Sequence, residues 1–194
     1  AIVAIDPKSG EILAYVSAPT YDPSLLSGRE RSVNYKLLES SPQKIFLNRP
    51  IQSNYPPGST FKPAQALALL EEVIITPNTY YSCHGGYYYT ARHKVGCHPH
   101  ASPLSLAPAI ANSCNAYFCA GYRTMMDSRK YLNIQNAMDT WKNHMVSLGY
   151  GYKLGVDLPY EKRGMIPNSN YYNKWYGKKG WRGATIISNA IGQG

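Results

Sequence analysis

The stretch Tyr-Pro-Pro-Gly-Ser-Thr-Phe-Lys-Pro, residues 55–63, decides which fold this chain is expected to adopt. Two prolines and a glycine favour a rigid turn, and the apolar run at 64–72 predicts a helix directly after it. Residues three apart on a helix share one face. With Ser59 as the first helical residue, Lys62 presents its amine to the Ser59 hydroxyl, so the pair predicts a nucleophile beside a base.

A serine hydroxyl is a poor nucleophile until a base takes its proton. Lysine is a base only when neutral, and lowering its pKa from about 10.4 to about 7 costs about 4.6 kcal/mol. Burial, a helix N-terminus and a second cation all act in that direction, and the same N-terminus offers a free N–H to an oxyanion. The alternative is a serine that caps the helix beside an exposed lysine. The spacing also occurs by chance, since Ser41-Pro42-Gln43-Lys44 repeats it without a following apolar helix.

A second group of polar residues, Ser113-Cys114-Asn115, lies at an expected break between two helices. A hydroxyl and an amide at such a break can line the same cleft, where one relays a proton and the other holds a substrate amide. This pattern is weak by itself, because Ser32-Val33-Asn34 matches it as well.

The rest of the chain predicts an α/β protein of the α+β type, with an antiparallel sheet flanked by helices. β-rich runs at 1–5 and 11–16, joined by a Pro/Gly turn, predict a hairpin. Further predicted elements are a strand around 87–89 and helices at 31–38, 60–72, 115–126, 133–148 and 184–191, with another starting at Ser102-Pro103. The segments 18–28, 48–58 and 154–167 are expected to be loops or extended.

The composition describes a globular protein, because 44% of the residues are hydrophobic and 16% are charged. The net charge of +9 raises the question of an anionic partner. The basic residues are scattered, however, and no nucleic-acid motif accompanies them, so we expect no nucleic-acid partner.

At this point the chain resembles the transpeptidase domain of class B penicillin-binding proteins, and most of all the elongation-type members. Ser-x-x-Lys followed by Ser-x-Asn is part of the signature that these proteins share with serine β-lactamases. Five segments carry the resemblance along the whole chain: IDPKSGEILA at 5–14, NR at 48–49, YPPGSTFK at 55–62, GVDLP at 155–159 with Glu161 and Gly164, and IGQG at 191–194.

The resemblance implies peptidoglycan D,D-transpeptidation during cell-wall elongation, with no cofactor in the chemistry. Ser59 is then the residue acylated by the D-alanyl-D-alanine stem peptide or by a β-lactam, and Lys62 takes its proton. Ser113 relays a proton to the leaving D-alanine, and Asn115 holds the substrate amide. A neighbouring stem peptide supplies the amine that resolves the acyl-enzyme.

The third family motif, Lys-Thr-Gly, is missing from residues 1–194. Lys178-Lys179-Gly180 and Lys153-Leu154-Gly155 lack the hydroxyl residue and precede the 191–194 run. We therefore expect 1–194 to be a partial transpeptidase domain. The Lys-Thr-Gly strand is expected beyond Gly194, and an N-terminal anchor and pedestal domain before residue 1. The resemblance also implies a single-pass anchor in a bacterial inner membrane, a periplasmic catalytic domain and a membrane glycosyltransferase of the elongation machinery as partner.

Four residues predict one structural zinc ion: Cys83, Cys97, His100 and Cys114, in the spacing Cys-x13-Cys-x2-His-x13-Cys. Three thiolates and one imidazole make a closed tetrahedral site, and some elongation-type relatives carry a comparable one. Two alternatives stay open, namely a disulfide between two of these cysteines and another imidazole in place of His100. The other imidazoles are those of His98, His93 and, more remotely, His84. Cys119 is expected to be a buried apolar residue.

Three other functions fit parts of the sequence. A D,D-carboxypeptidase or serine β-lactamase needs a group that activates water for deacylation. A penicilloyl-serine sensor acylates once and then signals. A non-enzymatic zinc module uses Ser59 only as a helix cap. The hairpin and the 155–164 segment favour the transpeptidase.

Overall fold

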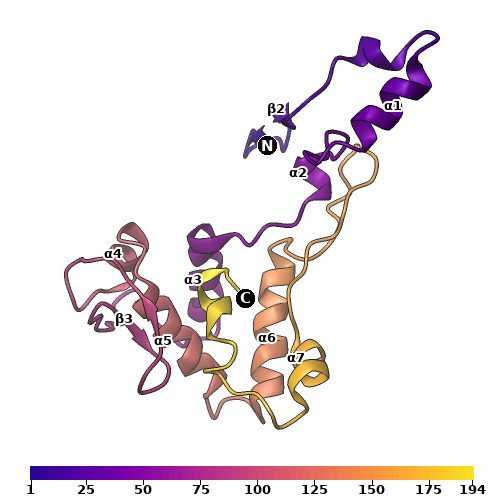
Figure 1. The fold of residues 1–194 in the computed structure, drawn as a ribbon. Helices are drawn as coiled ribbons and strands as arrows, with labels where there is room; N and C mark the ends of the chain where they lie inside the picture. The colour runs from indigo at the N-terminus through magenta and orange to yellow at the C-terminus, as the bar shows by residue number, and fades with distance from the viewer. The chain divides into compact units, whose positions relative to one another are not determined.

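The computed structural model describes all residues from Ala1 to Gly194, and they form two compact units (Figure 1). The first unit comprises residues 1–55 and 153–163, and the second comprises 56–152 and 164–194. No helix in either unit has the length and apolar character needed to cross a bilayer.

The first unit begins with the predicted hairpin. Strands β1 (Ile2–Ile5) and β2 (Ile12–Val16) pair antiparallel, with Val3 opposite Tyr15. The turn is held by the Asp6 carboxylate, which accepts the Lys8 N–H at 2.9 Å. Most of the apolar side chains of both strands are exposed, including Ile2 and Leu13.

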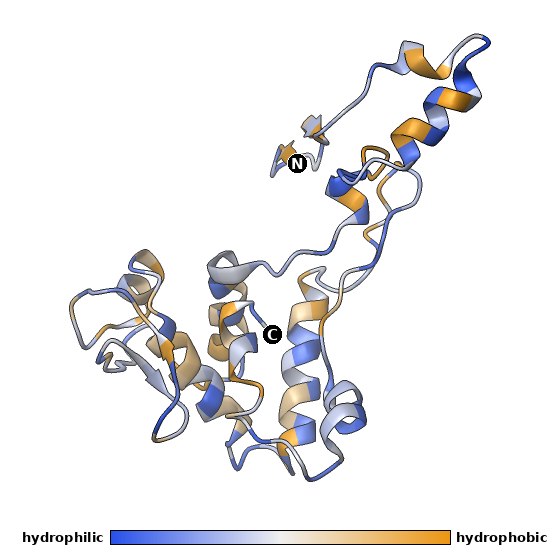
Figure 2. Cartoon of the chain, viewed as in Figure 1, coloured by the Kyte–Doolittle hydropathy of each residue, from blue (hydrophilic) through white to orange (hydrophobic).

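The remaining elements of this unit are short helices: η1 (Pro23–Leu26), α1 (Arg31–Glu39) and α2 (Arg49–Gln52). Helix α1 confirms the prediction at 31–38. The prediction of a loop at 48–58 is wrong at α2, because Pro50 lies in the first turn of a helix, where its missing N–H costs nothing. In Figure 2, α1 carries both hydrophobic and hydrophilic residues, and only Leu38 of this helix is buried.

The second unit is built around three helices that pack against one another: α3 (Lys62–Glu71), α5 (Asn115–Met126) and α6 (Ile134–Ser147). Its core is rich in large side chains, and Trp141, Trp181, Tyr117 and Tyr122 are fully buried. The prediction at 115–126 is confirmed residue for residue, and that at 133–148 to within one residue at each end.

Smaller elements complete the second unit: η2 (Gly58–Phe61), α4 (Leu106–Ala111), α7 (Ser169–Tyr176) and η3 (Ile187–Ile191), with the antiparallel pair β3 (Gly86–Tyr88) and β4 (Lys94–Gly96). The mixed helix and sheet class with antiparallel strands is confirmed.

Two helix predictions in the second unit need correction. The helix expected from Ser102-Pro103 begins only at Leu106, because Leu104 is extended and exchanges two hydrogen bonds of 3.1 Å with Tyr81. The helix expected at 184–191 is reduced to η3. Residues 182–185 form a tight turn, in which the Thr185 N–H bonds the Arg182 carbonyl and the Thr185 hydroxyl oxygen accepts the Arg182 N–H.

Helix α7 was not expected, although its aromatic residues Tyr171, Tyr172, Trp175 and Tyr176 recur at helical spacing. Hydrogen bonds at its N-terminus fix where this helix begins. Asn168 accepts the Tyr171 N–H at 2.9 Å, and the Asp139 carboxylate of α6 holds both the N–H and the hydroxyl of Ser169.

Candidate active site

The exposed Ser59 lies on the tight 3-10 turn η2, one turn before α3. The prediction that Ser59 opens the α-helix is therefore wrong. The helix starts at Lys62, whose N–H bonds the Ser59 carbonyl in the i to i+3 pattern. Pro57 favours this geometry because its carbonyl accepts the Thr60 hydroxyl at 2.7 Å, and Gly58 supplies a φ of 58°.

The turn is fixed on two sides. The Phe61 ring is buried and packs edge-on against Trp141 of α6 and against Tyr150. On the other side, the Gly58 N–H donates to the Gly192 carbonyl at 2.9 Å. Ser59, the candidate nucleophile, is thus exposed on a turn whose backbone is held by the Phe61 packing and the Gly58–Gly192 hydrogen bond.

Lys62 is only 1% exposed, so the alternative of an exposed lysine is wrong. Its ammonium donates to the Ser113 carbonyl at 2.6 Å, to Ser113 Oγ at 2.9 Å and to Asn115 Oδ1 at 2.6 Å. The structure therefore joins Lys62 to Ser113 and Asn115, the second predicted motif. The direct bond from Lys62 to Ser59 Oγ that the spacing suggested is not formed.

Burial lowers the pKa of Lys62 below its usual range, while the nearby thiols of Cys97, Cys114 and Cys119 act in the opposite direction. A buried ammonium is costly, and the three acceptors offset part of that cost. A lysine with a lowered pKa is the kind that can give up its proton and act as a base.

Ser113 has an unusual backbone. Its φ is 49°, in the left-handed region that serine rarely adopts. It connects α4 to α5, and the Ser113 and Cys114 N–H groups bond back to α4 carbonyls at 2.9 Å each. This sharp reversal directs both the carbonyl and the hydroxyl of Ser113 to Lys62, which is a use of local strain typical of functional sites.

Asn115 is the first residue of α5 and is held from two directions. Its Nδ2 donates to the Gly96 carbonyl of β4 at 2.8 Å while its Oδ1 accepts from Lys62. The N–H of Asn115 points at Cys97 Sγ, 3.3 Å away. The β3–β4 pair, of which β4 was not predicted, thus orients the second motif.

The four predicted metal ligands come together. The sulfur atoms of Cys83, Cys97 and Cys114 and a ring nitrogen of His100 all lie within 4.8 Å of one another, and all the cysteines are free thiols. Cys97 Sγ lies 3.3 Å from His100 Nε2, and His100 Nδ1 lies 2.6 Å from the Ala101 carbonyl. A ligating histidine commonly uses its second nitrogen in this way.

The thiols of this cluster differ in acidity. Burial opposes ionisation of Cys97, but the N–H groups of Asn115 and Ala116 and the His100 ring outweigh it and bring its pKa to about 7. Burial raises the pKa of Cys114 to about 12, and the neighbouring thiols add to this. The same cause raises the pKa of Cys119 to about 12, and that residue is fully buried, as expected.

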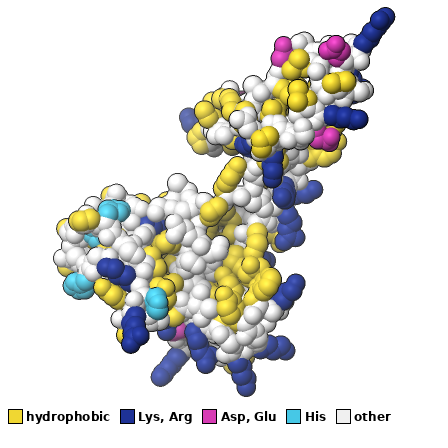
Figure 3. All heavy atoms as spheres, viewed as in Figure 1, with side chains coloured by type: hydrophobic (Ala, Val, Ile, Leu, Met, Phe, Trp, Pro, Cys, Tyr) yellow, Lys and Arg dark blue, Asp and Glu magenta, His cyan; other side chains and the backbone are white.

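Two of the alternative histidines, His98 and His93, have other hydrogen-bond partners. His98 Nε2 lies 2.7 Å from the Asn112 carbonyl, and His93 bonds the Thr90 hydroxyl. Figure 3 shows histidine side chains at the surface on the side of the second unit where β3 and α4 lie. His100 is the imidazole that the geometry groups with the three thiols.

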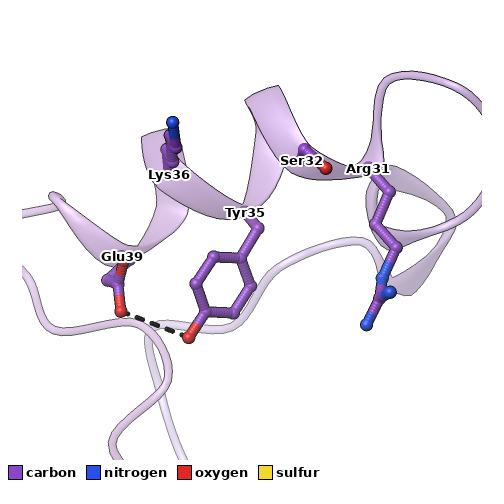
Figure 4. Close-up of a pocket in the computed structure, with 5 residues that line it drawn as sticks. All are labelled: Arg31, Ser32, Tyr35, Lys36 and Glu39. Carbon is purple, nitrogen blue, oxygen red and sulfur yellow. Dashed lines mark hydrogen bonds between the residues drawn. The ribbon is translucent and has the colours of Figure 1, made fainter.

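A separate pocket lies on α1 in the first unit (Figure 4), lined by Arg31, Ser32, Tyr35, Lys36 and Glu39. The Tyr35 hydroxyl crosses it to bond Glu39 Oε1 at 3.2 Å. All its lining residues come from one helix, and none belongs to the predicted site. We therefore place the candidate active site at Ser59, Lys62, Ser113 and Asn115.

Comparison with known protein families shows the family to which the chain belongs. The model of the penicillin binding protein transpeptidase domain matches residues 1–192. The chain belongs to this family. The match spans both compact units, and the Ser59 and Ser113 motifs lie within it.

Individual proteins of the transpeptidase family are similar to this chain in sequence and in structure. A curated peptidoglycan D,D-transpeptidase, MrdA of Acinetobacter baumannii, is 35% identical over all of this chain, which spans 28% of the length of that protein. The structure of penicillin-binding protein 2 of Pseudomonas aeruginosa in complex with WCK 5153 is 31% identical, with a TM-score of 0.81 over 99% of this chain and 42% of that one. A complex between penicillin-binding protein 2 and MreC from Helicobacter pylori is 27% identical, with a TM-score of 0.83 over 99% of this chain and 34% of that one.

Proposed function

We propose that this chain supplies the nucleophile and the proton-transfer groups of a peptidoglycan D,D-transpeptidase. The observation that carries the proposal is the buried Lys62 ammonium shared between Ser113 and Asn115 beside the exposed Ser59. A lysine without function rarely sits fully buried on neutral acceptors, because such burial costs free energy that a salt bridge would normally offset.

In the first half-reaction, Ser59 Oγ attacks the carbonyl carbon of the penultimate D-alanine, and neutral Lys62 accepts the hydroxyl proton. The terminal amide bond breaks, and the D-alanine nitrogen leaves with a proton that passes from Lys62 through the Ser113 hydroxyl. An ester on Ser59 remains. Asn115 holds the substrate amide, and the Ser59 N–H donates to the oxyanion.

In the second half-reaction, the amine of a neighbouring stem peptide attacks that ester. The new amide forms, the ester bond to Ser59 breaks, and Ser59 recovers its proton. A β-lactam follows only the first half, because its ring opens without releasing a leaving group from the site. The lowered pKa of Lys62 supports this assignment, since catalysis requires its neutral form.

A fluorescent penicillin tests the nucleophile in the full-length protein. The wild type and Ser41→Ala should be labelled and Ser59→Ala should not, because only Ser59 has the Lys62 cluster one turn away. Equal labelling of Ser59→Ala and the wild type would reject the assignment.

Product analysis separates the alternatives. A transpeptidase given donor and acceptor stem peptides forms a cross-linked dimer, and a D,D-carboxypeptidase releases D-alanine without one. A β-lactamase regenerates its free serine within minutes, and a sensor forms neither peptide product.

We further propose that Cys83, Cys97, His100 and Cys114 hold one structural zinc ion. Their grouping within 4.8 Å as free thiols and one imidazole supports this, because three thiolates and an imidazole are a typical closed zinc site. The ion would contribute folding free energy and link the 83–100 segment to the second motif.

Elemental analysis with thiol counting on the full-length protein tests the metal. We expect about one zinc per chain in the wild type, the same in Cys119→Ser, and a loss in Cys97→Ser. Less than a tenth of an equivalent of zinc, with two or fewer free thiols in the unfolded protein, would point to a disulfide instead.

The whole protein is proposed to be anchored in a bacterial inner membrane by a single helix, with this part in the periplasm beside a membrane glycosyltransferase of the elongation machinery. A similar chain in a solved peptidoglycan synthase complex that coordinates polymerization and crosslinking supports a partner of this kind. The Lys-Thr-Gly strand is proposed to follow Gly194. A full-length gene without a membrane helix or secretion signal, or without Lys-[Ser/Thr]-Gly after 194, would contradict these proposals.

A further inference from the structure

The buried amide of Asn189 links three elements of the second unit. Asn189 lies in η3 and is 3% exposed. Its Nδ2 donates to the Tyr122 hydroxyl of α5 at 3.2 Å and to the Tyr172 hydroxyl of α7 at 2.9 Å, and its Oδ1 lies 3.1 Å from the Tyr172 hydroxyl. One side chain therefore holds η3 against two helices.

The tyrosines are themselves constrained. Tyr122 is fully buried, and its hydroxyl donates onward to Met138 Sδ of α6 at 3.4 Å. Burial raises the pKa of both Tyr122 and Tyr172, so the hydroxyls stay protonated and can donate as well as accept. The orientation of η3 thus depends on directional bonds as well as on apolar contact.

The segment that leaves η3 lies against the turn that carries Ser59. The Gly192 carbonyl accepts the Gly58 N–H. A Cβ atom at Gly192 would lie 2.6 Å from the Gly58 carbonyl oxygen and 2.8 Å from Phe61 Cβ, so the two backbones touch with no space for a side chain. A shift of η3 must therefore move the residue before Ser59.

Asn189 also contacts the backbone of residues 192–194, which follow η3. A Cβ atom at Gly194 would lie 1.6 Å from Asn189 Oδ1, and the Gly192 N–H bonds the Asn189 carbonyl at 3.2 Å. The amide therefore packs directly beside the backbone of 192–194.

We propose that Asn189 is a positioning residue for Ser59, acting through Tyr122, Tyr172 and the contact between Gly192 and Gly58. The inference rests on the proposed acylation of Ser59. Without the amide, η3 would keep its apolar packing but lose its fixed orientation, and the nucleophile turn would sample geometries away from the attacking one. Misplacement by about 1 Å is enough to slow such a reaction markedly.

The test measures penicillin acylation of the full-length protein by stopped flow, which gives the first-order acylation rate constant, the affinity of the prior complex and the labelled fraction. Tyr122→Phe combined with Tyr172→Phe removes both hydroxyls without adding bulk beside Gly194. Adding Asn189→Leu removes the amide as well, so that no buried polar group is left unpaired and stability should return toward the wild type. Both variants should show a rate constant lower by about tenfold or more, with full labelling.

Asn173→Leu is the matched control. Asn173 on α7 accepts the Trp181 indole N–H at 2.9 Å, so this variant also breaks a structural bond, but away from 192–194. It should lower the melting temperature and leave the acylation rate constant unchanged.

Three outcomes would overturn the inference: an unchanged rate constant in both hydroxyl-free variants, a rate that recovers along with stability in the triple variant, or a fall in labelled fraction alone. The last two indicate a purely structural role. A wild type that is not acylated at all rejects the proposed function, and this inference with it.

Discussion

Glu72, at the end of α3, accepts hydrogen bonds from three side chains of the second unit. Its carboxylate bonds His144 Nε2 of α6 at 2.7 Å, the Tyr131 hydroxyl at 2.7 Å and the Lys130 ammonium, which also bonds the Glu72 carbonyl at 3.0 Å. Burial opposes ionisation of Glu72, but these donors outweigh it and lower its pKa from 4.5 to about 2. The cluster fastens the end of the helix that begins at Lys62.

The pKa difference gives a magnitude for Glu72→Gln. A change from 4.5 to about 2 corresponds to about 3 kcal/mol of native-state stabilisation as an upper bound. The Glu72 side chain is 12% exposed but that of Lys130 is 50% exposed, so solvent screens part of the attraction. We expect Glu72→Gln to lower the free energy of unfolding by about 1–3 kcal/mol at pH 7.

The sign of the pH dependence follows from the lowered pKa. The stabilisation is present above the unfolded-state value of 4.5 and is lost as the pH falls toward 2. The difference between wild type and Glu72→Gln should therefore shrink to about half or less by about pH 3.

The assay is hydrogen exchange of the α3 and α6 amides in the full-length protein between pH 7 and pH 3, which reports opening of this unit separately from other domains. Glu71→Gln, one residue earlier and exposed, is the control and should behave as the wild type. A difference of the same size at pH 7 and pH 3, or none at pH 7, would refute the argument.

Three further predictions concern the candidate site. Because burial lowers the pKa of Lys62, acylation by penicillin should rise with pH and reach its plateau below the ordinary lysine value of 10.5; a midpoint at or above that value would contradict a lysine base. Gly192→Ala should lower stability by about 1–3 kcal/mol and slow acylation, because a Cβ there meets Gly58 at a φ of 67°; calorimetry and stopped flow check this, and normal values of both would disprove the close contact. Ser113→Gly and Ser113→Ala both remove one acceptor of Lys62 and should slow acylation, but only glycine relieves the φ of 49°, so Ser113→Gly should have the higher melting temperature of the two; equal melting temperatures would show that the backbone is not strained.

The sequence predicted that Lys62, Ser113 and Asn115 belong to one site, but it did not predict which hydrogen bonds join the site residues. Ser59, Lys62, Ser113 and Asn115 were predicted as site residues because they match two family motifs, and the structure joins Lys62 to Ser113 and Asn115. The cluster of Cys83, Cys97, His100 and Cys114 was predicted because few cysteines and histidines are present, and the structure brings their sulfur and nitrogen atoms within 4.8 Å of one another. The direct Ser59–Lys62 bond was not correctly predicted, since a 3-10 turn replaces the first α-helical turn, and the choice between the two depends on contacts from Gly192 far along the chain.

Other features were not predicted. Helix α7 has aromatic residues at helical spacing, but the Asp139 carboxylate that holds Ser169 at its start lies 30 residues away. Strand β4 is three residues long and depends on pairing with β3. In the sequence, Asn189 is one of three polar residues in the otherwise apolar run at 184–191. Its partners lie 17 and 67 residues away, and only the folded chain brings the two tyrosines to it.

The place of Cys114 has a consequence for the evolution of drug resistance. Its side chain is completely buried and accepts the Tyr117 N–H, while the residues on either side both bond Lys62. On the proposed function, a substitution of Cys114 is therefore expected to disturb the thiol cluster and both partners of the lysine at the same time. If the chain is the proposed transpeptidase, β-lactam-resistant strains selected in culture should carry their changes at positions other than Cys114, and a fit resistant strain altered at Cys114 with an unchanged acylation rate for its natural substrate would show that the thiol cluster and the lysine are independent.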